Sequence, residues 1–531
     1  MTDKQRDLLG LTLGCLVLFG LRLGARDLWN PNEPIYGEAV SEMVQRGDWL
    51  VPYVNGIVFA EKPILFYWMA IVASKLLGGV SELSLRVPTL LAGIATVLGS
   101  YVLTRPYAGR ARALATSIVC ATLFGVFWNA RFVQMDIFVT AATVWVVIAI
   151  TRVIDHGAPP LRGFMLAGAV AAAGFIAKGP VAWICPALAL VAYLTATRRL
   201  SAILRWEMAA GAATCLVVAA PWYAMLLSTG HGDVLTEVLF RQNFARFVNP
   251  WDHRAPFWYY LETFWVDMAP WGFFVPLAVS LPRKGDGERR LATLAWAWIL
   301  SVVVFFSLSR SKRSPYILPI APAVAVLAGE VAWGSIVEQW SRRRRTAVVA
   351  ILSAIAALFV LGGGVVLVAA PRKLPAQATA AMLLGAVAVI AGALLAFDLL
   401  RARSRARAPL ALATGTLALY LMAAGVTLPA LDALKSARPV CGAIEGILAP
   451  GDALVSFELW NWRAEYRFYL RRPIENVFGR DKLRQVWTGS QRAVVLVEAD
   501  RLDDARQVIG TGEPVVTGRV GDRSVYVFTS R

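Results

Sequence analysis

Residues 26–68 read RDLWNPNEPIYGEAVSEMVQRGDWLVPYVNGIVFAEKPILFYW. This polar stretch interrupts a chain of 531 residues that is 57% hydrophobic and 17% charged, with a mean hydropathy of +0.57. A connection that only joined two membrane helices could be about five residues long. The length of the stretch and its many carboxylates therefore predict chemistry at a membrane surface. Its acidic residues are Asp27, Glu33, Glu38, Glu42, Asp48 and Glu61.

Apolar segments long enough to cross a bilayer recur along the first 430 positions. A crossing helix needs roughly 20 apolar residues, so the pattern is typical of a polytopic helical membrane protein. The first segment follows two basic residues and has no small-residue cleavage site, so we expect a retained helix and not a signal peptide. We expect about 13 transmembrane helices, at 7–24, 86–104, 111–128, 136–153, 161–178, 180–197, 204–227, 263–281, 291–308, 316–335, 346–370, 378–400 and 409–430.

Basic residues gather in short tracts between these segments. The tracts hold 18 Lys and Arg in 35 residues, whereas the polar loops 27–85 and 228–262 hold 6 in 94. The positive-inside rule then predicts a cytoplasmic N-terminus, with both polar loops and the C-terminus outside. The formal net charge of +18 thus reflects topology, and we expect no nucleic-acid partner. The tracts are 105–112, 198–205, 283–290, 342–345 and 401–407.

Two further segments complete the expected organisation. The apolar segment 64–78 is too short to cross, and counting it would invert every later loop, so we expect an interfacial or re-entrant helix on the outer face. Residues 431–531 have shorter apolar runs and more charge, which predicts a small periplasmic α/β domain after a transmembrane domain over 1–430. Its expected strands are 453–457, 493–499, 513–520 and 524–530, and its expected helices are 464–470 and 500–509.

The first polar loop carries the first candidate residues. Asn32 followed by Glu33 and Pro34 predicts a helix start with Asn32 as its cap. Glu38 and Glu42 recur on one face of that helix, where a solvated surface position is the favoured interpretation. Glu33 is the stronger candidate for chemistry, because it lies near helix-end donors beside the membrane.

Charged residues recur where the chain meets the membrane again. Glu61 and Lys62 lie directly before Pro63. Because an unpaired charge at the membrane is costly, they form either a structural ion pair or part of the active site. Arg131 and Asp136 flank the fourth span. Lys178 lies among apolar residues at membrane depth and either binds an anion or snorkels to the interface.

The later outer segments add cations. His253 and Arg254 are candidates to bind a phosphate or to support a carboxylate. Lys312 belongs to a basic group on the outer side, against the general charge rule, and an anionic lipid headgroup is the simplest reason for it. Carboxylates that supply a base and cations that stabilise a leaving phosphate together suit transfer of a sugar from a lipid-linked phosphate.

At these residues the chain resembles the bacterial lipid A aminoarabinose transferase family, which is related to protein O-mannosyltransferases and has the glycosyltransferase-C fold. The resemblance covers roughly 26–320, and the C-terminal domain matches less well. The motifs that carry it are LWNPNEPIYGEAVSEMVQRGDWLVP, FAEKPILFYW, RVPTLLAG, MDIF, AKGP, HRAPFWYYL and SLSRSKRSPYILP.

The resemblance implies a multi-pass protein of the bacterial inner membrane with a periplasmic active site. It also implies a polyprenyl-phosphate-linked sugar donor of the undecaprenyl type, inverting transfer, and a lipid or protein acceptor in the envelope. A divalent metal near Glu61 and His253 is allowed, but two ligands do not predict one. We assign Glu33, Glu61 and Asp136 as catalytic, Lys62, Lys178, Arg254 and Lys312 as donor phosphate ligands, and Asn32, Tyr36, Arg131, His253 and Tyr316 as supporting residues.

The chain departs from that family in the first loop. The family usually has Asp-Glu there, with the aspartate thought catalytic, and often an arginine three residues after it; this chain has Asn32-Glu33 and Ile35. Asparagine is no base. Either the base has moved to Glu33, or the donor or acceptor differs, or activity is lost.

Other functions remain open at this point. A protein O-glycosyltransferase would have the same fold, and a relative without activity would serve as a scaffold. A lipid transporter or flippase would need charged residues through the membrane depth, whereas here they gather at the outer ends, which favours the enzyme.

Overall fold

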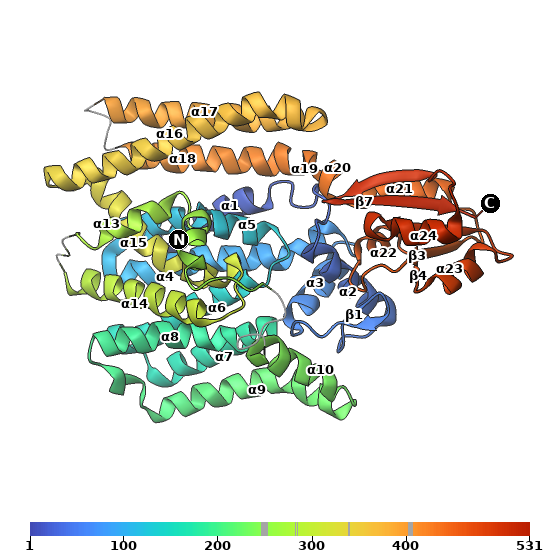
Figure 1. Cartoon of the computed structure of the whole chain (residues 1–531). Helices are drawn as coiled ribbons and strands as arrows, with labels where there is room; N and C mark the ends of the chain where they lie inside the picture. Colours follow the sequence, from blue (N-terminus) through green and yellow to red (C-terminus); the bar gives the residue numbers. More distant parts are fainter. Residues whose placement is uncertain (246–252, 282, 284, 338–339, 402–406, 531) are drawn as a thin grey trace. The chain divides into compact units, whose positions relative to one another are not determined.

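The computed structural model describes residues 1–530 apart from 246–252, 282, 284, 338–339 and 402–406. Contacts divide the chain into two compact units, whose elements Figure 1 labels. Unit 1 comprises Met1–Leu23, Ala60–Phe66 and Arg86–Thr427, and unit 2 comprises Gly24–Phe59, Tyr67–Leu85 and Leu428–Arg531. The first polar loop thus groups with the C-terminal segment.

Unit 1 is helical throughout. Over the described ranges, nine helices are long and apolar enough to cross a membrane. The expected class, a polytopic all-α membrane protein with a small C-terminal sheet, is confirmed, while the number of 13 crossings stays a prediction. The elements are α1 (Asp3–Gly20), α4 (Glu82–Ala121), α5 (Phe124–Arg131), α6 (Asp136–His156), α7 (Pro160–Lys178), α8 (Val181–Ala196), η1 (Leu200–Ile203), α9 (Trp206–Ser228), α10 (Gly232–Thr236), η2 (Glu237–Ala245), α12 (Tyr259–Asp267), η3 (Trp271–Phe274), α13 (Val275–Ala278), α14 (Asp286–Leu308), η4 (Ser314–Ile320), α15 (Ala321–Val337), α16 (Arg342–Lys373), η5 (Pro375–Gln377), α17 (Ala378–Leu400), α18 (Ala408–Met422) and η7 (Ala423–Thr427).

Two expected spans differ from the structure. The span 111–128 is divided between the second arm of α4, which ends at Ala121, and α5, whereas 86–104 lies in the first arm of α4, before the kink at Gly109, where φ is 81°. The segment 263–281 is not one helix but is divided among α12, η3 and α13. Proline explains that division, because it removes a backbone donor and collides with the preceding turn, and Pro270 and Pro276 both lie in this segment.

Small residues allow the helices of unit 1 to pack closely. A Cβ added to Gly168 of α7 would lie 2.0 Å from the carbonyl oxygen of Gly211 in α9, and one added to Gly363 of α16 would lie 2.5 Å from that of Gly385 in α17. Such close backbone approach is typical of helices packed in membranes. Figure 1 shows α16, α17 and α18 side by side.

The C-terminal part of unit 2 is a three-layer α/β structure. Its five-stranded sheet has the order β4-β3-β5-β7-β6, with β3 parallel to both β4 and β5 and the other pairs antiparallel. One face packs against α21 and α22 and the other against α23 and α24. The elements are α19 (Leu428–Ala430), α20 (Asp432–Lys435), α21 (Arg438–Ile447), β3 (Ala453–Phe457), α22 (Glu465–Leu470), β4 (Glu475–Val477), α23 (Arg480–Trp487), β5 (Ala493–Glu498), η8 (Ala499–Arg501), α24 (Leu502–Ile509), β6 (Val516–Val520) and β7 (Arg523–Thr529).

The first polar loop supplies the remaining elements of unit 2. These are α2 (Asn32–Arg46), the antiparallel pair β1 (Tyr53–Val54) and β2 (Ile57–Val58), and α3 (Leu65–Leu76), whose first two residues group with unit 1. At 1.5 Å per residue the 12 residues of α3 extend about 18 Å, which is less than a bilayer core. A short helix was therefore the right expectation; its place at the interface stays a prediction.

The solvated interpretation of α2 was wrong. The side chains of Glu38 and Glu42 are 2% and 1% exposed. Arg467 of α22 binds both carboxylates, at 2.9 Å and 3.4 Å, and Arg46 binds Glu42 at 3.1 Å. Burial raises the pKa of Glu38 to about 8, although Arg467 lowers it; Glu42 raises it further. The apolar spacing could not reveal this, because the partner comes from a distant part of the chain.

The stem of the first polar loop, residues 27–29, is also bound by residues of the C-terminal segment. Asp432 accepts hydrogen bonds from the backbone N–H of Asp27 (3.0 Å) and the indole of Trp29 (2.7 Å). The hydroxyl of Tyr469 accepts the N–H of Leu28 at 2.7 Å, and Arg438 pairs with Asp27 at 2.8 Å. The C-terminal segment therefore fixes the beginning of the first polar loop.

Candidate active site

A buried ion pair joins two candidate residues of unit 1. The ammonium of Lys178 donates to the carboxylate of Asp136, and the two side chains are 13% and 12% exposed. The same ammonium lies 5.3 Å from the ring centroid of Tyr316. The sequence had left open whether Lys178 binds an anion or snorkels; within this chain its anion is Asp136.

Helix ends bring these three residues together. Asp136 is the first residue of α6, where the helix dipole favours a carboxylate, and Lys178 is the last of α7, where it favours a cation. The two helices pack on each other, and η4, which carries Tyr316, packs on α6. Gly179 ends α7 with φ of 88°, a conformation that strains any side chain. An ammonium has three donors. Of these, Asp136 takes one.

Glu61 and Lys62 lie just before α3, in the part of unit 1 formed by Ala60–Phe66. Both side chains are half-buried, and the ammonium of Lys62 donates to the backbone carbonyl of Glu61 at 3.1 Å. Over the described ranges the Glu61 carboxylate has no hydrogen bond or ion pair. It is therefore an acceptor that a substrate proton could reach without breaking an existing interaction.

Glu33, by contrast, is tightly bound within unit 2. Its carboxylate accepts two hydrogen bonds from Arg26, at 2.7 Å and 2.8 Å, and a third from the backbone N–H of Trp29 at 3.0 Å. Glu33 is 2% exposed and Arg26 4%. Bidentate pairs of this kind are strong and geometrically fixed. The assignment of Glu33 as a base stays a prediction. Its carboxylate also has a structural role, because it binds Arg26 and the backbone of Trp29.

Asn32 and Tyr36 lie beside Glu33. Asn32 is the first residue of α2, as expected, but the expectation that it caps the helix was wrong: Pro31 is at the cap position and no side chain caps. Asn32 is half-buried, and its side chain has no hydrogen bond to a described residue. Tyr36 is 7% exposed and packs edge-on against Phe59, with ring centroids 6.0 Å apart.

The cations of the later outer segments are arranged differently from one another. Arg254 pairs with Ser311 in an isolated antiparallel bridge, and Lys312 N–H donates to the His253 carbonyl at 2.9 Å. His253 and Arg254 are exposed. The ammonium of Lys312 is buried and donates to the backbone carbonyls of Ala255 (3.2 Å) and Ser309. Lys312 thus holds this bridge together.

Arg131 has a structural position. It is 4% exposed and donates to the carbonyls of Phe19 (2.7 Å) and Leu21 (2.9 Å) at the end of α1. A helix leaves its last carbonyls without partners, so Arg131 caps α1.

The sequence reasoning missed several residues. Arg26 was within seven positions of Glu33 and could have been found as its partner. Asp432, Arg438, Arg467 and Tyr469 could not, because they are more than 350 positions from the residues they bind. Asp267 was also missed; the hydroxyl of Ser314 lies within hydrogen-bond distance of both of its carboxylate oxygens, at 2.7 and 2.6 Å, and donates its one proton to them.

The residues present do not support a metal site. Among the described residues no group of three or more His, Cys, Asp or Glu side chains could hold an ion. A metal near Glu61 and His253, which the resemblance allows without predicting it, would need a further ligand. We derive no step through a metal.

Comparisons with known proteins now bear on this arrangement. A protein-family model described as dolichyl-phosphate-mannose-protein mannosyltransferase matches residues 61–224. An undecaprenyl phosphate-alpha-4-amino-4-deoxy-L-arabinose arabinosyl transferase of Shewanella sediminis is 31% identical over 320 residues, covering 59% of this chain and 57% of the relative. That of Pseudomonas aeruginosa (strain PAO1) is also 31% identical, over 330 residues, covering 59% and 58%. The aligned part is therefore under two thirds of each relative.

The structural likeness covers nearly the whole chain. The crystal structure of ArnT from Cupriavidus metallidurans bound to undecaprenyl phosphate has a TM-score of 0.80 at 22% identity and covers 99% of this chain and 98% of that one. The fold is thus that of a multi-pass membrane protein of the glycosyltransferase-C class. Within that class, the expected resemblance to the lipid A aminoarabinose transferase-like family is confirmed.

Proposed function

We propose that this chain is an inner-membrane glycosyltransferase that moves a sugar from a polyprenyl-phosphate donor to a lipid A-like or other envelope acceptor on the periplasmic side. The observation that carries the proposal is the Lys178–Asp136 pair at adjoining helix ends, with donors left on the ammonium. The names of the curated relatives, which are arabinosyl transferases, and the fold of the undecaprenyl phosphate-bound transferase support it.

In the proposed reaction an acceptor oxygen attacks the anomeric carbon of the sugar from the side opposite the phosphate. The bond from that carbon to the phosphate oxygen breaks, and polyprenyl phosphate leaves with both electrons. Negative charge then grows on the phosphate, where Lys178 and Lys62 stabilise it. Asp136 orients Lys178 for this role, and Tyr316 shields it.

A base is needed only if the acceptor is a hydroxyl. Glu61 is the best placed group for that proton, because its carboxylate has no partner among the described residues, whereas Glu33 is held by Arg26 and Trp29. An acceptor that is already an anion, such as a lipid phosphate, needs no base. Asn32 in place of the family's aspartate fits that case.

The second candidate is a protein O-glycosyltransferase. The family model that matches 61–224 is described as a protein mannosyltransferase, so a Ser or Thr hydroxyl is the alternative acceptor. In that case Glu61 becomes essential.

Mass spectrometry of a deletion strain tests both candidates. We expect a mass increment to vanish from lipid A or another envelope lipid, and to return with wild type but not with Lys178→Met. Loss from proteins alone would select the second candidate. Unchanged lipids and glycoproteins would overturn the proposal.

A further inference from the structure

A basic cavity of about 540 Å³ lies in unit 1, away from the candidate active-site residues. Its wall comes from the start of α1, the bend of α4 and the end of α6. The bend makes the space, because Gly109 leaves helical geometry at φ 81° and ψ 176° and nothing lies within 4 Å of where its Cβ would be. Small-molecule sites typically have about 300–1,000 Å³, so the cavity is large enough for a ligand.

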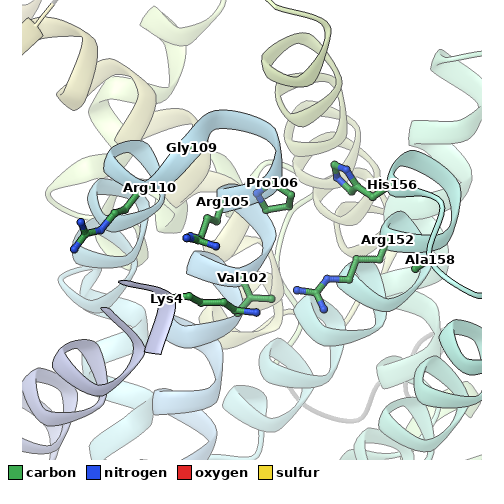
Figure 2. A pocket seen from close by; sticks show the side chains of 9 residues that line it. All are labelled: Lys4, Val102, Arg105, Pro106, Gly109, Arg110, Arg152, His156 and Ala158. Atoms are coloured by element: carbon green, nitrogen blue, oxygen red, sulfur yellow. The ribbon is translucent and has the colours of Figure 1, made fainter. Parts of the chain in front are cut away.

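The charged residues of the cavity wall are all cations, with the neutral His156 beside them. Lys4, Arg105, Arg110, Arg152 and His156 line it, and no carboxylate does so among the residues described. Figure 2 shows the side chains of Lys4 and Arg152 extending toward a common space beside Arg105, while the guanidinium of Arg110 points away from it.

The cations of the wall differ in their partners. Arg110 is neutralised by Asp7 through two hydrogen bonds of 2.8 Å. The side chains of Lys4, Arg105 and Arg152 form no ion pair or hydrogen bond with any residue in the described ranges, although Arg105 interacts with the charge of Asp7 at longer range. The Nε of Arg105 is even buried without an acceptor. A buried donor without a partner costs roughly 1–3 kcal/mol, more if charged, so an anion bound here would be stabilised by satisfying it.

Neighbouring cations at this end of unit 1 are balanced. Arg112 pairs with Glu288, and Asp155 takes Arg199 at 2.6 Å and Arg290 at 3.6 Å. The positive-inside rule explains why basic residues gather on this side. It does not explain why three of them converge on one half-buried cavity without a carboxylate.

We propose that this cavity binds a phosphate group, presented by an anionic lipid headgroup or by a soluble phosphate. Guanidinium groups match phosphate oxygens bidentately, and an ammonium adds a point charge that is free to rotate. Two guanidinium groups and one ammonium thus suit an anion that carries several acceptor oxygens and up to two charges. Neither the candidate active site nor the proposed transfer requires this ligand.

The test compares purified, delipidated full-length protein in detergent with a paired variant. Arg105→Gln/Arg152→Gln removes two cavity cations. Arg342→Gln/Arg343→Gln removes two exposed ones at the start of α16 and changes the net charge equally. The probes are phosphatidylglycerol, zwitterionic phosphatidylcholine and inorganic phosphate, followed by native mass spectrometry and thermal shift.

We expect wild type and the control to retain phosphatidylglycerol or phosphate, and the cavity variant to bind at least 10-fold more weakly. Retention of phosphatidylglycerol that phosphate does not displace identifies a lipid headgroup; binding of inorganic phosphate without lipid identifies a soluble source. The unliganded cavity variant should melt no lower than wild type, since it loses only mutual repulsion. Equal binding by both variants, or none by wild type, overturns the proposal.

Discussion

Two of the buried cation–carboxylate pairs, Arg26–Glu33 in unit 2 and Lys178–Asp136 in unit 1, are built differently. Glu33 receives three hydrogen bonds from Arg26 and the Trp29 backbone, and Arg26 also donates to the Asp27 carbonyl at 2.9 Å. Over the described ranges, Lys178 has a single carboxylate contact, to Asp136, and one aromatic ring near its ammonium, that of Tyr316. A saturated pair fixes a fold, whereas a pair with donors left over can take up a further anion.

Removing one partner of the saturated pair should have the largest effect. Arg26→Gln leaves the Glu33 charge buried, which costs about 3–5 kcal/mol of unfolding free energy. Hydrogen exchange over residues 24–59 of the full-length protein measures it, with exposed Lys435→Gln as the control. Arg26→Met/Glu33→Gln should regain much of the loss. Equal protection in Arg26→Gln and the control would show that the pair does not hold the loop.

Removing the cation of the Lys178–Asp136 pair should affect sugar transfer more than stability. Lys178→Met is expected to lower sugar transfer by about 100-fold or more, the usual effect of losing one stabilising group. Asp136→Asn should lower it less, since it only orients the ammonium. Exposed Lys75→Met is the matched control. Transfer by Lys178→Met at the control's rate would remove Lys178 from the donor site.

The buried acid of α2 predicts a pH effect in unit 2. Burial raises the pKa of Glu38 from 4.5 to about 8, so between these values the folded state holds a proton that the unfolded state has released. Stability then falls as pH rises, by about 1.4 kcal/mol per pH unit. From pH 6 to 7.5 this is about 2 kcal/mol. Glu38→Gln should flatten the hydrogen-exchange profile of α2, and an equally steep profile would contradict the assignment.

The smallest predicted effect concerns the α4 bend. Gly109→Ala forces a side chain into positive φ, at a cost of about 1–2 kcal/mol. Gly14→Ala in α1, where nothing lies within 4 Å, should instead gain about 1 kcal/mol. Thermal unfolding of the two full-length variants should therefore shift in opposite directions. A shift in the same direction would mean that the bend is not set by Gly109.

Local patterns predicted what local forces decide. Four strands of the C-terminal sheet were predicted close to their observed positions, because alternation and β-branched residues mark strands within a few positions. They are β3, β5, β6 and β7. β4 and α23 were missed, since three residues and a polar helix leave no such mark. Hydropathy found the apolar helices. It did not show the break between α4 and α5, nor the division of the span 263–281, where Pro270 lies.

The candidate site was predictable in its residue types but not in its pairing. Asp136 and Lys178 stood out as charges at membrane depth, and their cost required a partner. That each is the other's partner depends on two helix ends meeting, which no spacing shows. Glu38 and Glu42 were misread for the same reason: their cation, Arg467, lies in the C-terminal domain.

The stem of the first loop also sets an order of assembly during synthesis. Asp27 and Asp432 are separated by 405 positions. At ribosomal speeds of about 5–20 residues per second, the second emerges roughly 20–80 s after the first. Until then Glu38 of α2 is without Arg467, its partner from the C-terminal segment, while the membrane helices are inserted one after another. A chain that stops early would carry every motif of the first loop and still lack the last hundred residues that close it.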